Sequence, residues 1–187
     1  MHYLHKILVY IPYVKESCGE ASNKSELMNN IRMYAEHETE EYYCDVFDWR
    51  ETQTAGRWEN EYPENVLLAE DDVQKFADEL KTTMINQKSY IDDALTKLRK
   101  TIGTDLEEIV EKHWESDRYS FNEDDDLVIE TSMLNLMSII CMLSGTYTSD
   151  SMFYNTYNGT ARIYPSDIRI VERYPEDWAL VMFDYHD

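Results

Sequence analysis

A chain of 187 residues with 38 acidic and 17 basic side chains carries a formal net charge of -21, which excludes the function classes that depend on a basic surface. Proteins hold bare nucleic acid by placing Lys and Arg against phosphates, and anionic membranes attract basic segments, so we expect neither as a ligand. With 43% apolar and 13% aromatic residues the chain is too hydrophobic for an acidic disordered tail. We therefore expect one folded domain over residues 1–187.

The cysteines and the N-terminal sequence predict an intracellular protein. Cys18, Cys44 and Cys141 form no CxxC pair and are odd in number, as is typical of reduced thiols. The opening residues 1–6 lack the basic start and apolar stretch of a signal peptide. The most apolar stretch, Met133 to Leu143, is too short to span a bilayer. We expect a cytoplasmic location.

The first third of the chain is predicted to alternate between strand and helix. Tyr3–Val14 is rich in β-forming residues and predicts a strand, in which Pro12 marks an end or a sheet edge. A helix is predicted from about Ser25, and a strand over Tyr42–Trp49. Segment 50–65 shows no period and predicts a long loop, which in a compact domain is often functional. Its aromatic residues either serve such a function or cap the edge of the core.

The clearest pattern is the apolar stripe between Val73 and Ile102. Steps of three and four residues hold without an internal Gly or Pro, so we predict one helix about 45 Å long with Gly103 as its C-terminal cap. Gln87 and Lys88 interrupt the stripe and predict a kink or a solvent-exposed middle. The stripe faces the core of the domain or, alternatively, forms the seam of a dimer.

Two capping boxes follow the long helix. The first, Thr104–Glu107, predicts a short helix, and the second, Ser120–Glu123, predicts a helix that runs to Leu143. Because 134–143 is apolar on nearly all sides, we expect this second helix to be the central buried helix of the domain.

After Gly145 the pattern changes to that of strands. Asn158-Gly159 is a strong turn signal and predicts a hairpin over 152–164. Two more strands are predicted, over 168–174 and 178–185.

These elements predict an α+β domain. The expected sheet is largely antiparallel, contains the N-terminal strand together with the C-terminal strands, and packs against a helical layer that includes the long helix. The helical segment covers about 70–144 and the C-terminal β segment about 151–186.

Catalytic and metal-binding signatures are absent from the sequence. HExxH, calcium-loop, Cys/His-finger, GxSxG and Gly-rich phosphate-loop patterns do not occur. One alternative remains, a small hydrolase or metal-dependent enzyme that uses Cys18 or a group formed by His2, His5 and His186. Because His2 and His5 are three residues apart on a predicted strand, they should lie on opposite faces. We predict no catalytic residue, no metal and no cofactor.

Acidic residues concentrate between Asp105 and Glu130, where eleven Asp or Glu residues face only Lys112 and Arg118. Helix residues three or four apart stand about 6 Å from each other, similar to the spacing of phosphates along a nucleic acid. Carboxylates at such intervals could occupy a basic groove built for DNA or RNA, with fast association. The residues expected to bind such a partner are Glu107, Glu108, Glu111, Glu115, Asp117, Asp124, Asp125, Asp126 and Trp58.

In size and charge, and in the acid-rich segment Glu107–Glu130, the chain is similar to small acidic inhibitors carried by phages and mobile elements, including DNA-mimic and anti-CRISPR proteins. This similarity contains no shared motif, so it assigns no functional residue. It implies an inhibitor that blocks the nucleic-acid-binding surface of a basic protein such as a nuclease. The alternative is a structural or regulatory module, a homodimer through the long helix, whose acidic surface only keeps the protein soluble.

Overall fold

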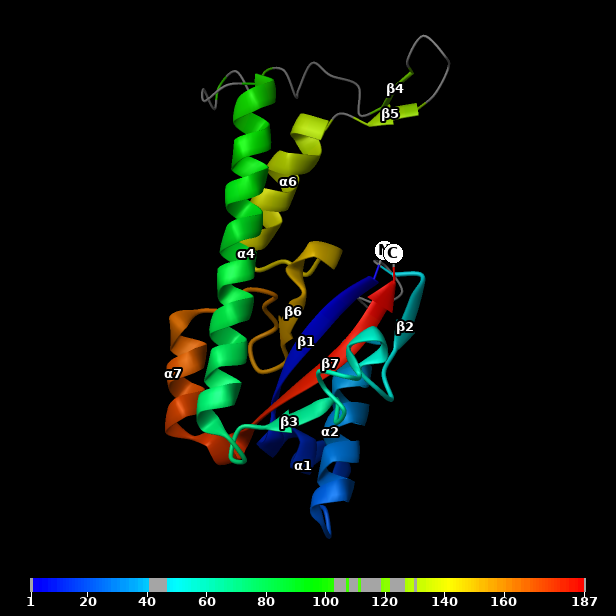
Figure 1. Cartoon of the computed structure of the whole chain (residues 1–187), viewed down its shortest axis with the longest axis vertical. Helices are drawn as coiled ribbons and strands as arrows, with labels where there is room; N and C mark the ends of the chain where they lie inside the picture. The colour runs from blue at the N-terminus through cyan, green and yellow to red at the C-terminus, as the bar shows by residue number, and fades with distance from the viewer. Residues whose placement is uncertain are drawn as a thin grey trace.

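The structure, a computed structural model, describes residues 2–40, 47–102, 107, 111, 119–121, 127–129 and 131–186. Its strands are β1 His2–Tyr10, β2 Trp49–Glu51, β3 Val66–Leu68, β4 Tyr119–Phe121, β5 Leu127–Ile129, β6 Phe153–Asn155 and β7 Trp178–His186. Its helices are α1 Ile11–Cys18, α2 Lys24–Glu38, α4 Val73–Ile102, α6 Thr131–Ser144 and α7 Pro165–Arg173, with short 3-10 turns η1 Gly56–Trp58, η2 Ser149–Ser151 and η3 Pro175–Asp177 (Figure 1). None of the helices in these ranges combines the length and the apolar character required to cross a membrane.

The first and last strands of the chain form the centre of the main sheet (Figure 1). β1 and β7 pair antiparallel along their whole length, from His2 opposite His186 to Tyr10 opposite Trp178. The strand order is β2-β7-β1-β6, and β3 also pairs with β7. The predicted α+β class and the union of the two terminal strands are therefore confirmed. The sheet is mixed, because β6 runs parallel to β1.

Helices cover both faces of this sheet, which explains the continuous apolar run Ile7–Val9 in β1. Ile7, Leu8 and Val9 each have 0% of their surface exposed. Ile7 and Val9 point to the face covered by α1 and α2, where Ile31 joins their cluster. Leu8 points to the opposite face, where it meets Phe76 of α4 and residues of α7. Two buried clusters thus sandwich the sheet.

Helix α4 has the bounds that the apolar stripe predicted. Gln87, however, is buried rather than part of an exposed middle, and α4 continues through it as one helix. Its Nε2 donates to the carbonyl oxygens of Ser151 (3.0 Å) and Ala161 (2.7 Å), and its Oε1 accepts from Ile163 N (3.1 Å). A polar side chain stands in the stripe because it satisfies backbone groups of the neighbouring chain segment.

One predicted strand ends earlier than expected, and another is a helix. The strand predicted over Tyr3–Val14 ends at Tyr10, and α1 begins at once with Pro12 in its first turn. Proline fits there because the first N–H groups of a helix have no intrahelical acceptor. The strand predicted over 168–174 is α7, whose buried Ile168 and Val171 stand three residues apart, as on one face of a helix.

The predicted hairpin over 152–164 is also wrong. Only Phe153–Asn155 forms a strand, and its long-range partner is β1. A single bridge joins Asn155 to Thr160 across the turn that contains Gly159. Beyond that turn, the backbone groups of Ala161 and Ile163 hydrogen-bond to Gln87 instead of extending the pairing. Asn158-Gly159 therefore forms a turn within a loop and does not connect two paired strands.

The helix predicted from Ser120 begins only at Thr131. Residues 119–121 and 127–129 pair with each other as antiparallel strands β4 and β5. The short helix predicted from Thr104 falls largely on residues outside the described ranges. So does most of the strand predicted over 42–49, of which only 47–49 are described.

Helix α6 is not the central buried helix that its composition predicted. Met137, Ile140 and Leu143 are 41%, 48% and 49% exposed. Its buried contacts lie on one side, where Ile139 joins a small cluster with Ala94 and Leu98 of α4. Apolar residues all round a helix bury it only when neighbours surround it, and in the described structure α6 contacts chiefly α4.

Candidate binding surface

Helices α4 and α6 lie side by side as a hairpin that extends beyond the sheet (Figure 1). The acid-rich segment joins Ile102 to Thr131, which are the ends of the two helices farthest from the sheet. Within it, Glu107 and Glu111 are described, and both are helical and exposed. The other predicted binding carboxylates, Glu108, Glu115, Asp117, Asp124, Asp125 and Asp126, lie outside the described residues.

Trp58 belongs to a different part of the molecule. It lies in the loop between β2 and β3, half-buried against the cluster on the α4 face of the sheet. Asp184 holds this loop, because its Oδ2 accepts a hydrogen bond from Arg57 N (3.1 Å). Gly56 passes so close that an added Cβ would stand 2.3 Å from the same oxygen. The structure therefore places Trp58 in the packing of the loop, apart from Glu107 and Glu111.

Charge is distributed unevenly within the hairpin and the segment that joins its two helices. Segment 103–130 holds eleven acidic and two basic residues, whereas α4 holds six basic and four acidic ones. Helix α6 has no charged residue at all. In segment 131–173 the three acidic residues are balanced by three basic ones. The two helices of the hairpin, which we call its shaft, are thus neutral to slightly basic, whereas the sequence that joins them is strongly acidic.

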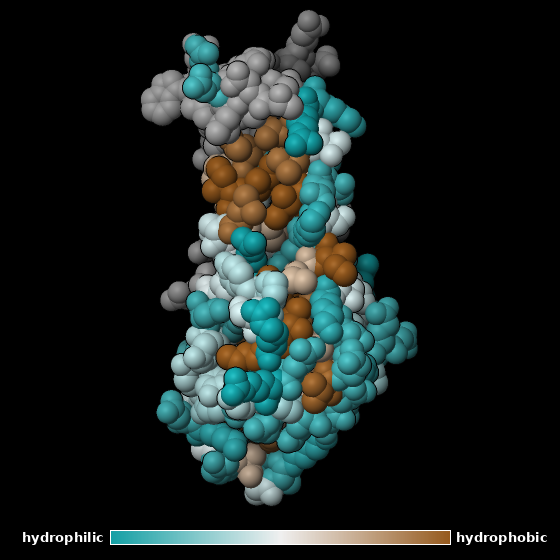
Figure 2. All heavy atoms as spheres, turned by 90° about the vertical axis from the view of Figure 1, so that its left-hand side faces the viewer, coloured by the Kyte–Doolittle hydropathy of each residue, from teal (hydrophilic) through white to brown (hydrophobic). Residues whose placement is uncertain are grey.

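The shaft also carries an exposed apolar surface, which we call the hairpin face and define by Ile85, Met137, Ile140 and Leu143. Ile85 of α4 is 63% exposed, the largest exposure among the apolar side chains of the described residues. Figure 2 shows apolar atoms gathered on the hairpin directly below the grey residues. A groove of about 450 Å³ adjoins the face and is lined by Met84, Ile91, Met142 and Ile163 among others. Large exposed apolar patches on other proteins are often interaction sites.

The three histidines of the alternative enzyme site do not form one group. His2 and His186 are cross-strand neighbours with ring centres 4.9 Å apart, and each contacts a carboxylate, Asp184 at 2.8 Å and Asp48 at 2.7 Å. His5 lies on the opposite face of the sheet from His2, as their three-residue spacing predicted. There its ring packs against Phe47 and Tyr185. Among the described residues no group of three or more His, Cys, Asp or Glu side chains is arranged to hold a metal.

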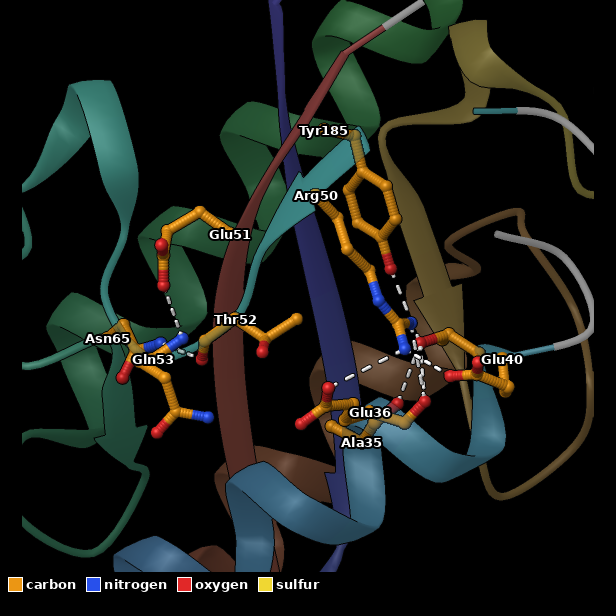
Figure 3. Close-up of polar contacts among 10 residues, drawn as sticks. Ala35, Glu36, Glu40, Arg50, Glu51, Thr52, Gln53, Asn65 and Tyr185 are labelled. Carbon is orange, nitrogen blue, oxygen red and sulfur yellow. Dashed lines mark hydrogen bonds and ion pairs between the residues drawn. The ribbon is translucent and has the colours of Figure 1, made fainter. Parts of the chain in front are cut away.

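A buried hydrogen-bond network connects His5 to Arg50. The Tyr147 hydroxyl lies 2.8 Å from His5 Nδ1 and hydrogen-bonds to Tyr185, which in turn hydrogen-bonds to Arg50 (Figure 3). Burial raises the pKa of Tyr147 well above its usual value, so this phenol stays neutral. Its protonated hydroxyl acts as a fixed hydrogen-bonding group within the core.

Arg50 links this network to the end of α2. Its guanidinium pairs with Glu40 and lies 3.6 Å from the carboxylate of Glu36 (Figure 3). Only 8% of the Arg50 side chain is exposed. On the other side of β2, Asn65 Nδ2 donates to the carbonyl oxygen of Thr52. These contacts fix β2 and the end of α2 against the sheet, which is a structural role.

A polar cleft of about 340 Å³ lies between α4, β1 and η2. Lys6, with 10% of its side chain exposed, donates from Nζ to Glu79 Oε2 (2.7 Å) and to Thr83 Oγ1 (3.2 Å). The same ammonium group also lies 5.9 Å from the centre of the Tyr62 ring. At the other side of the cleft, Tyr90 donates to Asp150 Oδ2 (2.7 Å). The volume is at the low end for ligand pockets.

Sequence reasoning missed both the cleft and the hairpin face. Lys6 was detectable as a lone charge inside an apolar strand, at an even position beside Leu4 and Leu8. The hairpin face had no such signal, because exposed and buried apolar residues look alike in sequence.

Comparisons of the chain with protein-family models, with curated proteins and with solved structures found no match.

Proposed function

We propose that this protein is a non-catalytic, cytoplasmic inhibitor that binds a basic, nucleic-acid-binding protein, such as a nuclease, and occupies the surface on which that protein holds nucleic acid. The observation that carries the proposal is the position of the acid-rich segment at the far end of the α4–α6 hairpin. Acidic side chains on a protrusion can enter a basic groove that a flat acidic surface could not reach. Opposite potentials would also speed the encounter.

The contrast in charge within the hairpin supports a specific contact at its end. A solubilising surface requires only that charge be spread over the exterior. In this chain the shaft of the hairpin is close to neutral and the segment beyond it carries nine more acidic than basic residues. Glu107 and Glu111, one helical turn apart, are both exposed, so their carboxylates are accessible to a partner.

Charge reversal with a matched control tests the proposal. One variant replaces Glu107, Glu108, Glu111 and Glu115 by Lys. The control replaces four exposed glutamates of the sheet domain and its surrounding loops by Lys, with the same change in net charge: Glu16, Glu20, Glu70 and Glu176. Tagged protein then captures partners from a lysate at low and at high salt.

The captured protein is purified, and its affinity for a nucleic-acid duplex is measured with and without the inhibitor. We expect the hairpin variant to bind this protein at least roughly 100-fold more weakly, the control to bind nearly normally, and salt to weaken both. Equal binding by the two variants would overturn the proposal. So would a captured protein that holds nucleic acid as tightly in the complex as when free.

A further inference from the structure

We propose that the hairpin face is the contact surface for a second copy of this chain, with the two hairpins packed antiparallel in a four-helix arrangement. The inference does not depend on the proposed function, because it concerns the shaft of the hairpin and not its acidic end. It begins from α6, a helix of fourteen residues with no charged side chain in a chain whose charged fraction is 29%. Met137, Ile140 and Leu143 stand three residues apart along its exposed side, which gives one continuous apolar stripe.

Charge decides which partner fits this face. A basic protein would be drawn to the acidic segments, and α4, with six basic and four acidic residues, offers it no attraction. Two copies of a chain with a net charge of -21 repel each other over most of their surfaces. The neutral to slightly basic shaft is the region where they can approach with little repulsion, since charges beyond about 8 Å are screened at physiological ionic strength. The hairpin face is therefore better suited to contact with the same face of a second copy than with a basic protein.

The same reasoning fixes the direction of packing. Parallel hairpins would bring two acid-rich ends together, each with eleven acidic residues against two basic ones. Antiparallel hairpins point these two ends in opposite directions and so keep them apart. With a two-fold axis that passes near Ile140, α6 packs on α6 of the second copy, Ile140 meets Ile140, and Met137 of one copy meets Leu143 of the other. Short antiparallel hairpins pair into four-helix bundles in this way.

Sedimentation equilibrium of the full chain over a wide range of concentration tests the association. We expect a mass twice that of the 22.3 kDa chain. Ile140→Glu should raise the dissociation constant at least roughly 100-fold, because it would bury two like charges in the contact. Met33→Glu is the matched control, since Met33 is 56% exposed on α2 and lies outside the face; it should leave the dimer intact. A wild-type chain that stays monomeric, or equal effects of both variants, would overturn the proposal.

Cysteine cross-linking tests the direction. In a background with Cys18, Cys44 and Cys141 replaced by Ser, a short bismaleimide should join Ile140→Cys chains to each other. Leu143→Cys should cross-link poorly to itself and well to Met137→Cys in a mixture of the two proteins. Parallel packing would place α6 against α4 of the second copy and would abolish all of these products, which contradicts the antiparallel arrangement. The Ile140→Glu variant also separates this proposal from the proposed function. It should no longer form a dimer, yet it can still capture the basic partner protein from a lysate.

Discussion

The β1–β7 ribbon and the α4–α6 hairpin contain similar apolar side chains, yet the first is buried and the second is half exposed. Every residue of β7 from Trp178 to Tyr185 is buried. The cluster between the two helices of the hairpin has only three buried members, Ala94, Leu98 and Ile139. The difference lies in the number of covering layers, because helices cover both faces of the sheet, whereas α6 packs chiefly on α4. An apolar pattern therefore predicts that a surface needs a partner, and the fold decides whether that partner is in the same chain.

The largest expected effect contrasts the two regions directly. Phe183 has 0% exposure at the centre of the sheet, so Phe183→Ala should lower the free energy of unfolding by about 3–5 kcal/mol, through lost burial and the cavity left behind. Ile85→Ala, at a 63% exposed position, should change it by less than about 0.5 kcal/mol. Urea unfolding measures both, in the Ile140→Glu background so that association does not contribute. Similar losses at the two positions would remove the distinction between core and hairpin face.

The next effect lies where α4 leaves the sheet domain. Gln87→Leu keeps the size of the side chain but removes the partners of two carbonyl groups and of Ile163 N. Buried backbone groups left without a partner are costly, and we expect a loss of about 3 kcal/mol in the free energy of unfolding. Asn86→Leu, at the exposed neighbouring position, is the control and should be close to neutral. A neutral result for Gln87→Leu would mean that the segment around Ala161 does not depend on α4.

A smaller loss is expected at the buried ion pair of the cleft. Lys6→Met leaves the Glu79 carboxylate without its cation, although Tyr62 still donates to Glu79 Oε2 at 3.0 Å. Removing one partner of a fully buried pair costs roughly 3–5 kcal/mol, and we expect about 2 kcal/mol because Glu79 keeps some contact with water. Adding Glu79→Gln to Lys6→Met should recover part of this loss. If the double variant is the less stable of the two, the charge of Glu79 is not the cause.

These contrasts also show what could be predicted from the sequence. The bounds of α4 follow from its stripe and its lack of Gly and Pro, and the union of β1 with β7 follows from the need of an opening strand for partners. Both are local or nearly local properties. The failures have another origin. Pro12 fits a strand edge and a helix start equally well. Within the seven residues 168–174, Ile168 is related to Ile170 by strand spacing and to Val171 by helix spacing. In both places tertiary packing decided between strand and helix.

The candidate site was predictable only as a charge pattern. The clustering of acids beyond Ile102 could be read directly from the sequence. Neither the exposed side of α6 nor the separation of Trp58 from the acidic segment could be inferred. Both depend on which surfaces the fold covers, and that information is spread over contacts between residues distant in sequence, such as Asp184 with the loop at Arg57.

The smallest expected effect is a titration at Tyr90, in the part of α4 that joins the two regions. Burial, followed by the hydrogen bond to Asp150, raises the pKa of Tyr90 to about 12, while a hydrogen bond with Ser138 of α6 lowers it. The folded-state pKa exceeds the unfolded value of about 10, so the stabilising contribution of Tyr90 is complete below pH of about 10 and is lost as the pH rises towards 12.

NMR of isotope-labelled tyrosine rings, assigned with Tyr90→Phe, measures the pKa directly. Asp150→Asn should lower the pKa only in part, since burial is the larger cause, and Ser138→Ala should raise it. A Tyr90 that titrates with the exposed tyrosines would show that the base of the hairpin is open to water, and the boundary between the buried and the exposed region would then lie closer to the sheet.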